Sequence, residues 1–216
     1  MKKLLPLFFL FFNVICLGQQ LKIEGAYKQT KQGIHSLLLV KDGYASETRY
    51  KDNAYLSTRG GPFEVKNGKL LIALEYSDNN KDEIGSQVLI SLQSSTKMKP
   101  IRQDLDALWR ITGRLQNGVI TEIPRTDRKT IKILVDGYFQ WIAINPAEKG
   151  FYGTGGGQYH FTNNKYQEKI LFFSRDNTRV GQQLSFDGVV NSRQWTHSGL
   201  SSKGDPIKEI WSKEIN

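Results

Sequence analysis

Short blocks of the first half of the sequence recur, in the same order, in the second half. The spacing between matching blocks is nearly constant along the chain. The matching pairs are 23–25 with 111–113, 39–44 with 133–138, 60–63 with 156–159, 67–69 with 163–165, 75–77 with 172–174, 84–88 with 180–184, and 108–110 with 210–212. Agreement in both order and spacing indicates a duplicated unit. We therefore expect the chain to fold as two related halves.

Within each half, short apolar runs end at turn signals. The run Ser36–Val40 leads into Lys41-Asp42-Gly43, and the run Phe63–Val65 leads into Asn67-Gly68. Asp-Gly and Asn-Gly between such runs are strong signals for a β-hairpin, because both central positions of the turn need positive φ. The 3.6-residue period of a helix is not sustained over helical length. The one helix candidate is a short piece between Pro100 and Leu108.

These patterns predict an all-β fold of antiparallel strands, with about eight strands in each half. An up-and-down meander of this size closes into a small barrel, which removes exposed sheet edges. The expected architecture is two tandem up-and-down β-barrels, formed by residues 19–110 and 111–216. The alternative is one larger barrel or sandwich built from both halves.

Residues 1–18 have the pattern of a secretory signal peptide. Two lysines precede an apolar stretch over residues 4–17, and Gly18 ends it. The stretch is short for a membrane span, so a lone membrane anchor is the less favoured alternative. Cys16 is the only cysteine, and Ile15 stands where a lipoprotein signal needs a small residue. We expect export to the periplasm or the medium, with no transmembrane segment in the mature chain.

The net charge of the chain is positive, at +9. The basic residues are spread along the sequence and form no run. A nucleic-acid-binding protein would be expected to gather them into one footprint. The charge therefore indicates a soluble basic surface and no nucleic-acid partner.

The second half resembles a group of exported, uncharacterised lipocalin-like domains over residues 108–213. The blocks that carry this resemblance are 133–143 (ILVDGYFQWIA), 153–159 (GTGGGQY), 172–176 (FFSRD) and 195–206 (WTHSGLSSKGDP). The first half carries an eroded copy, which lacks the GTGGG and SSKGDP segments. The resemblance implies a calycin-type barrel. It supplies neither a ligand nor a reaction.

Several catalytic and cofactor motifs fail on their context. The glycine run 153–157 is followed by strand-like sequence, whereas a phosphate-binding loop needs a helix there. The three histidines, His35, His160 and His197, are far apart and have no cysteine partners, so no zinc spacing can be written. No nucleophile has a visible base beside it. We expect no cofactor, no metal and no catalytic residues.

Arg175 follows a very apolar strand, 172–174. A buried cation is costly unless it is paired, so Arg175 needs a partner. Asp176, Asp187 and Glu209 are the acidic candidates. The functional alternative is an anionic ligand head group at a barrel mouth, because the planar guanidinium binds a carboxylate with two parallel hydrogen bonds.

The leading hypothesis is therefore non-catalytic binding of a small apolar or amphipathic ligand inside a barrel. The candidate ligand-binding residues are Gln140, Trp141, Tyr159, His160, Phe173, Arg175, Trp195 and His197. They include both faces of one strand, so some must point outward. Such a binder requires a cavity above ~300 Å³. The alternatives are an envelope interaction module with filled barrels, and an enzyme that uses His160 or His197 as acid or base.

Overall fold

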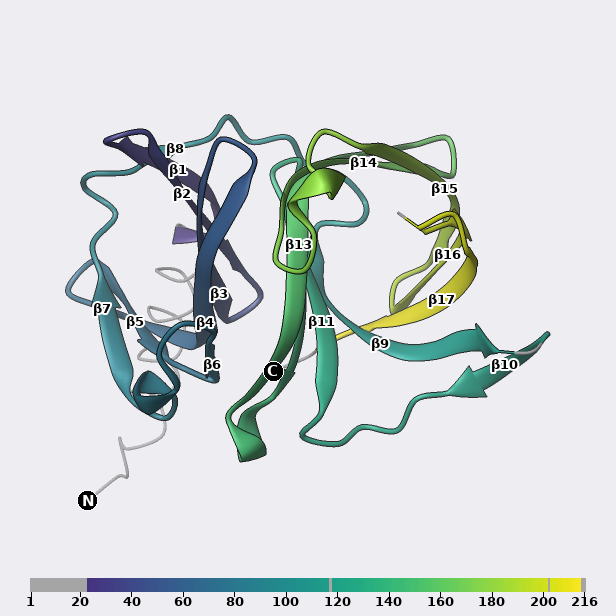
Figure 1. The fold of residues 1–216 in the computed structure, drawn as a ribbon, viewed down its shortest axis with the longest axis horizontal. Helices are drawn as coiled ribbons and strands as arrows, with labels where there is room; N and C mark the ends of the chain where they lie inside the picture. The colour runs from purple at the N-terminus through teal and green to yellow at the C-terminus, as the bar shows by residue number, and fades with distance from the viewer. Residues whose placement is uncertain (1–22, 117, 202, 215–216) are drawn as a thin grey trace, which may run out of the picture.

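The computed structural model describes residues 23–116, 118–201 and 203–214, so the expected signal peptide lies outside the described residues. The described chain consists of antiparallel strands and short 3-10 helices, arranged in two sheets that correspond to the two halves (Figure 1). The predicted all-β antiparallel fold is confirmed, with one closed barrel and a second antiparallel sheet. No helix among these residues is long and apolar enough to cross a membrane.

The first half forms an open sheet with the strand order β7-β5-β4-β3-β2-β1-β8, and β6 pairs with β4. Its elements are β1 (Gly25–Lys31), β2 (Ile34–Lys41), β3 (Tyr44–Lys51), β4 (Ala54–Lys66), β5 (Lys69–Ala73), β6 (Tyr76–Ser77), η1 (Lys81–Glu83), β7 (Gln87–Ile90) and β8 (Thr96–Lys97). Among the described residues, the end strands β7 and β8 do not pair with each other.

The second half closes into a barrel, because β9 pairs with both β11 and β17. Its elements are β9 (Ala107–Gln116), β10 (Val119–Glu122), β11 (Lys129–Val135), β12 (Tyr138–Asn145), η2 (Pro146–Glu148), β13 (Gly150–Thr162), β14 (Lys165–Phe173), η3 (Asn177–Arg179), β15 (Gln183–Val190), β16 (Gln194–Leu200) and β17 (Pro206–Lys213). Within the described part of the chain, β10 pairs only with β9, and this hairpin projects from the barrel (Figure 1). β9 crosses the boundary expected between residues 110 and 111 and lies wholly in the second sheet.

The two Asp-Gly turns form the predicted hairpins. In β2–β3, Asp42 has φ 47° and Gly43 has φ 76°. In β11–β12, Asp136 has φ 52° and Gly137 has φ 76°. Two consecutive residues with positive φ form the tight turn whose twist matches that of the flanking strands. Local turn chemistry therefore sets the register of both hairpins.

The duplication is visible in the backbone of the long strands β4 and β13. A Cβ added at Gly61 would collide with the carbonyl oxygen of Ala73, and one added at Gly157 would collide with that of Lys169. In both strands the glycine lies where the neighbouring strand is irregular, so backbone approaches backbone. Glycine at equivalent positions of β4 and β13, each at a close approach of two backbones, supports the predicted repeat.

Three of the matched blocks need correction. Gly60 pairs with Tyr76 and Gly156 pairs with Phe172, so the match of 75–77 with 172–174 is one residue out of register. β9 opens the second sheet as β1 opens the first. Its equivalent of Gly25 is therefore Ala107, and 111–113 lies farther along the strand. The block 108–110 belongs to this opening strand, so it does not close the first half.

The halves pack together through their sheet faces, without a flexible linker. Leu37 and Leu39 on β2 share a buried apolar cluster with Ile131 and Ile133 on β11. In Figure 1, β11 and β13 lie along the side of the barrel that faces the first sheet. Both faces of β11 are therefore buried from Ile131 to Val135.

A buried hydrogen-bond network crosses this interface. The Gln140 amide donates to the hydroxyl oxygens of Thr58 (3.1 Å) and Thr154 (3.0 Å). The amide oxygen accepts from the Ser46 hydroxyl at 2.7 Å. Ser46 and Gln140 hold equivalent positions of the repeat, as do Thr58 and Thr154. The network therefore joins matching residues of the two halves.

The two Asp-Gly turns also bind across the interface, each to the other half. The Asp136 carboxylate accepts from the backbone N–H of Ala26 at 3.1 Å, at the start of β1. The Asp42 carboxylate accepts from the backbone N–H of Leu108 at 2.9 Å, at the start of β9. This reciprocal exchange fixes the first strand of each sheet to the turn of its counterpart.

The segment between Pro100 and Leu108 is not a helix, contrary to the sequence-based expectation. Its polar side chains form other hydrogen bonds instead. The Gln103 side chain accepts from the Phe161 backbone N–H at 2.6 Å, and Asp106 accepts from the Gln103 backbone N–H. The buried Leu105 packs into the barrel core. Tertiary contacts at the barrel end thus replace helical hydrogen bonds.

Candidate functional site

The second barrel contains a cavity of about 450 Å³. Its wall includes the side chains of Phe139, Trp141 and Phe173. Its open end is surrounded by residues at the same ends of neighbouring strands and in the adjoining loops: Arg114, Arg128, Thr130, Ala143, Arg175, Ser201 and Lys203. The opposite end of the barrel is filled by the aromatic core around Trp109 and Tyr159. The cavity is therefore a pocket closed at one end.

A buried ion pair borders the cavity. The Lys132 ammonium lies 3.2 Å from Glu168 Oε1, and the two side chains are only 5% and 8% exposed. The Tyr166 hydroxyl donates to the same carboxylate oxygen at 2.7 Å. The ammonium also lies 4.9 Å from the ring centre of Trp211 and 5.1 Å from that of Trp195. A carboxylate and aromatic faces together satisfy a cation that would otherwise be costly to bury.

A second polar pair, His197 and Glu209, lines the same cavity. The two side chains hydrogen-bond at 2.9 Å, and the Trp211 indole N–H donates to Glu209 at 3.2 Å. Burial lowers the pKa of His197 below its ordinary value of 6.5. Burial opposes ionisation of Glu209, but the hydrogen bond from His197 and the charge of Lys132 outweigh it and lower the Glu209 pKa. At neutral pH the imidazole is neutral, and its Nε2–H donates to the carboxylate.

The other ring nitrogen of His197, Nδ1, is buried and has no hydrogen-bond partner in the described part of the chain. With Nε2 protonated, Nδ1 carries a free lone pair. A histidine oriented by a carboxylate inside a cavity is the arrangement that the acid–base alternative requires. His160 lacks it, because it lies exposed on the outer face of β13.

Two arginines at the open end are held by neutral groups of Tyr152. The Arg175 guanidinium donates to the Tyr152 carbonyl through Nε at 2.7 Å and also through Nη2. The Arg128 guanidinium lies 3.5 Å from the centre of the Tyr152 ring. The acidic partners considered for Arg175 are engaged elsewhere: Asp176 with Arg179, Asp187 with Lys165, and Glu209 with His197.

Gly155 makes room for the aromatic wall. A Cβ at this position would lie 2.7 Å from the Trp141 indole nitrogen and 2.8 Å from the Phe173 ring. The two rings meet edge to face, with centroids 5.5 Å apart. Because Gly155 has no side chain, both rings can lie against the strand and leave the centre of the barrel open.

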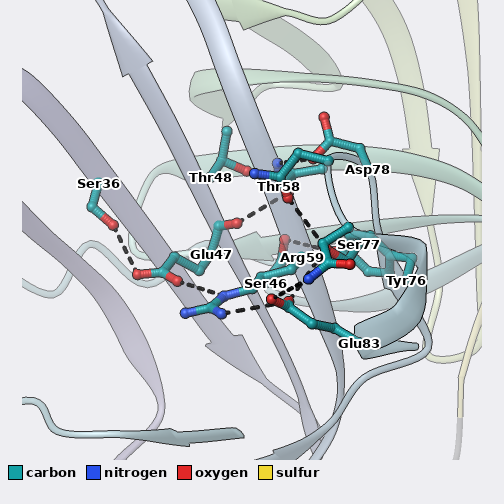
Figure 2. Close-up of polar contacts among 12 residues, drawn as sticks. Ser36, Ser46, Glu47, Thr48, Thr58, Arg59, Tyr76, Ser77, Asp78 and Glu83 are labelled. Atoms are coloured by element: carbon teal, nitrogen blue, oxygen red, sulfur yellow. Dashed lines mark hydrogen bonds and ion pairs between the residues drawn. The ribbon is translucent and has the colours of Figure 1, made fainter. Parts of the chain in front are cut away.

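The first half provides an internal comparison for the barrel wall. The cross-strand pair Trp141 and Gly155 corresponds to Glu47 and Arg59 on β3 and β4. Arg59 bridges Glu47 at 3.0 Å and Glu83 at 3.7 Å, so ion pairs cross the corresponding place (Figure 2). An aromatic wall in the second half replaces a polar bridge in the first.

The buried charges differ between the halves as well. Lys132 corresponds to Leu38, and Glu168 corresponds to Ile72. Both residues of the first half belong to a buried apolar core. The same strand framework thus folds around leucine and isoleucine at these positions. The buried ion pair is therefore not a requirement of the framework.

The predicted ligand-binding residues fall into three groups. Trp141, Phe173, Arg175 and His197 line the cavity. Tyr159 and Trp195 lie inside the barrel and belong to its aromatic core. Gln140 and His160 do not reach the cavity. The strand alternation turns Gln140 toward the first half and His160 toward solvent.

Sequence reasoning missed Lys132 and Glu168, and it named Glu209 only as a possible partner of Arg175. A signal for Lys132 was present, because it is the one charged residue in the run Ile131–Val135. When the two repeats are aligned, Lys132 takes the position that Leu38 holds in the first half. Glu168 lies in the polar run Gln167-Glu168-Lys169, and Glu209 follows Lys208; charged residues in such sequence ordinarily face solvent. Their two-residue spacing from Tyr166 and Ile170, and from Ile207 and Trp211, was the local signal that they share the inner face of the barrel.

The described residues contain no group of three or more His, Cys, Asp or Glu side chains placed to hold a metal ion. No family model and no curated protein matches the chain. Among solved structures, the chain is similar to the crystal structure of an uncharacterized protein from Bacteroides eggerthii. The similarity covers 51% of this chain and 100% of that protein, with 12% identity and a TM-score of 0.37.

Proposed function

We propose that this chain is an exported binding protein, periplasmic or secreted, whose second barrel holds a small apolar or amphipathic ligand without catalysis. Export rests on the signal-peptide pattern of residues 1–18. Binding rests on the cavity of about 450 Å³, which exceeds the low end of ligand pockets, ~300 Å³. An aromatic wall with a few convergent polar groups is the usual composition of such a pocket.

The observation that carries the proposal is the difference between the two halves. Where the first half has Glu47 and Arg59 joined by an ion pair, the second has Trp141, Gly155 and an open space. A cavity lowers the stability of the folded chain, because the atoms that line it lose packing contacts. A bound ligand would compensate for this loss.

Native mass spectrometry tests the proposal on the protein purified from its own host. We expect a small molecule bound at one per chain. The double variant Trp141→Glu/Gly155→Arg introduces the pair found in the first half, and we expect it to purify without the molecule. His160→Arg is the matched control, because it introduces an arginine on the outer face of the same strand. This variant should keep the ligand.

Wild-type protein whose mass shows no ligand, even after exposure to a mixture of lipids and metabolites, would refute the binding proposal. The interaction-module alternative would then take its place. One feature favours that alternative: the projecting β9–β10 hairpin exposes Leu115, Val119 and Ile120. Exposed apolar residues on one hairpin are typical of a contact surface.

A further inference from the structure

Positive charge exceeds negative charge around the cavity. Five cationic side chains line it: Arg114, Arg128, Lys132, Arg175 and Lys203. The carboxylates among the lining residues are Glu168 and Glu209, and both are already engaged. Glu168 pairs with Lys132 and Tyr166, and Glu209 binds His197 and Trp211. The excess charge therefore lies at the open end and not at the buried ion pair.

Two of the arginines at the open end, Arg128 and Arg175, are held by neutral contacts. Arg128 stacks on an aromatic ring, and Arg175 donates to a backbone carbonyl. Both contacts involve Tyr152, so one residue holds the two guanidinium groups on the same side of the mouth. Neutral contacts of this kind fix the position of an arginine without cancelling its charge.

The apolar surface of the cavity adjoins these charges. The Arg175 guanidinium lies 6.0 Å from the Trp141 ring centre, and Trp141 meets Phe173 edge to face. A molecule with one anionic group and an apolar body would therefore meet both surfaces at once. Arginine binds carboxylate and sulfonate groups well, because it offers parallel N–H donors in one plane.

We propose that the ligand of the second barrel is a small organic anion. Its negative group lies between Arg128 and Arg175 at the mouth, and its apolar body lies against Trp141 and Phe173. Lys132 does not bind the anion, because Glu168 already neutralises it. This inference rests on the proposed binding function and narrows it to one chemical class.

Two fluorescent probes with similar aromatic bodies test the inference. Anilinonaphthalene sulfonate is an anion, and phenylnaphthylamine is neutral. In titrations of the purified full chain, we expect the anionic probe to bind at least ~10-fold more tightly, since charge-assisted hydrogen bonds contribute this much. Raising the ionic strength should weaken the binding of the anionic probe alone.

The variants Arg128→Gln and Arg175→Gln remove the charge and keep a polar side chain. Each should weaken binding of the anionic probe by about 10-fold and leave binding of the neutral probe within about twofold. Arg193→Gln is the charge-matched control, because Arg193 is exposed and is not among the lining residues. This control should bind both probes as the wild type does.

Equal affinity of the wild type for the two probes would overturn the anion inference and leave the binding function standing. The anion inference also fails if Arg193→Gln weakens binding of the anionic probe as much as Arg128→Gln and Arg175→Gln do. If neither probe binds, both the inference and the proposed function fail. If Arg128→Gln and Arg175→Gln lose affinity for the anionic probe alone, the result supports both the anion inference and the proposed binding function.

Discussion

At the scale of single residues, the buried charges of Lys132 and Glu168 are an energetically costly feature of the second barrel. Each side chain is almost fully buried, and desolvation of an ion costs several kcal/mol. The attraction between the two opposite charges partly offsets this cost, and a single charge left without its partner loses that compensation. Lys132→Leu or Glu168→Ile should therefore each lower the free energy of unfolding by roughly 3–5 kcal/mol. Urea denaturation measures the loss.

The combined variant Lys132→Leu/Tyr166→Phe/Glu168→Ile is the control for this prediction. It removes both charges and the hydroxyl that would lose its partner, and it introduces the Leu38 and Ile72 of the first half at the charged positions. We expect its stability to return to within about 1–2 kcal/mol of the wild type or above it. A combined loss as large as the sum of the single losses would contradict our account of the ion pair.

His197 should make stability depend on pH. The pKa of the folded-state imidazole lies below 6.5, so the unfolded chain takes up a proton first as the pH falls. Stability should be complete above about pH 6.5 and decline below it. The lowered pKa of Glu209 adds a further loss below its ordinary 4.5. In denaturation series from pH 5 to 8, His197→Gln should flatten this decline.

The exposed His160 provides the matched variant for the pH series. His160→Gln leaves His197 and Glu209 in place and changes a residue outside the cavity, so the decline that we assign to His197 should remain. A decline that survives in His197→Gln and disappears in His160→Gln would assign the effect to the wrong histidine and reject our description of the site.

Single residues were predictable from the sequence where the local pattern was unusual. Arg175 stood out because it follows a very apolar strand, and it lies at the cavity mouth. Gln140 could not be placed, because the first half buries the outer face of its strand. Both faces of that strand are apolar as a result, and alternation alone does not show which face points inward.

At the scale of elements, strand β13 depends on its glycines. The Gly157 position faces the Lys169 carbonyl so closely that any Cβ forces the two backbones apart. Gly157→Ala should cost roughly 1–3 kcal/mol or more, as overpacking in a dense core does. Gly113→Ala is the control, since its added Cβ would meet only ordinary contacts of 3.4–3.5 Å. Thermal or urea unfolding compares the two variants, and equal effects would disprove the close-approach argument.

The hairpins were predictable because their turns carry their own chemistry. Asp42-Gly43 and Asp136-Gly137 require no tertiary partner to adopt positive φ. Closure of a sheet is a different matter, because it depends on strands distant in sequence. The second barrel closes through β9 and β17. In the first half, β8 (Thr96–Lys97) pairs with β1 as β17 pairs with β9, but it has only two residues, and no strand equivalent to β16 joins it to β7 among the described residues. No local pattern distinguishes these outcomes.

At the scale of the whole molecule, the open first sheet and the closed barrel share one buried interface. The apolar cluster of β2 and β11, the Gln140 network, and the reciprocal Asp42 and Asp136 contacts all cross it. Separating the halves would expose this apolar surface and leave buried polar groups without partners. We infer that neither half is stable alone and that the chain unfolds as one cooperative unit.

The tryptophans allow a direct test of this coupling. All four lie in the second half, at positions 109, 141, 195 and 211, so their fluorescence reports on the barrel alone. Leu70 is fully buried in the separate core of the first half, and Leu70→Ala should cost about 2–5 kcal/mol. In a coupled molecule, this variant shifts the tryptophan transition to lower urea, together with the far-UV circular dichroism transition. If the tryptophan transition stays in place while circular dichroism shows earlier loss of strand, the halves unfold independently. The interface contacts would then hold two separate folding units in position.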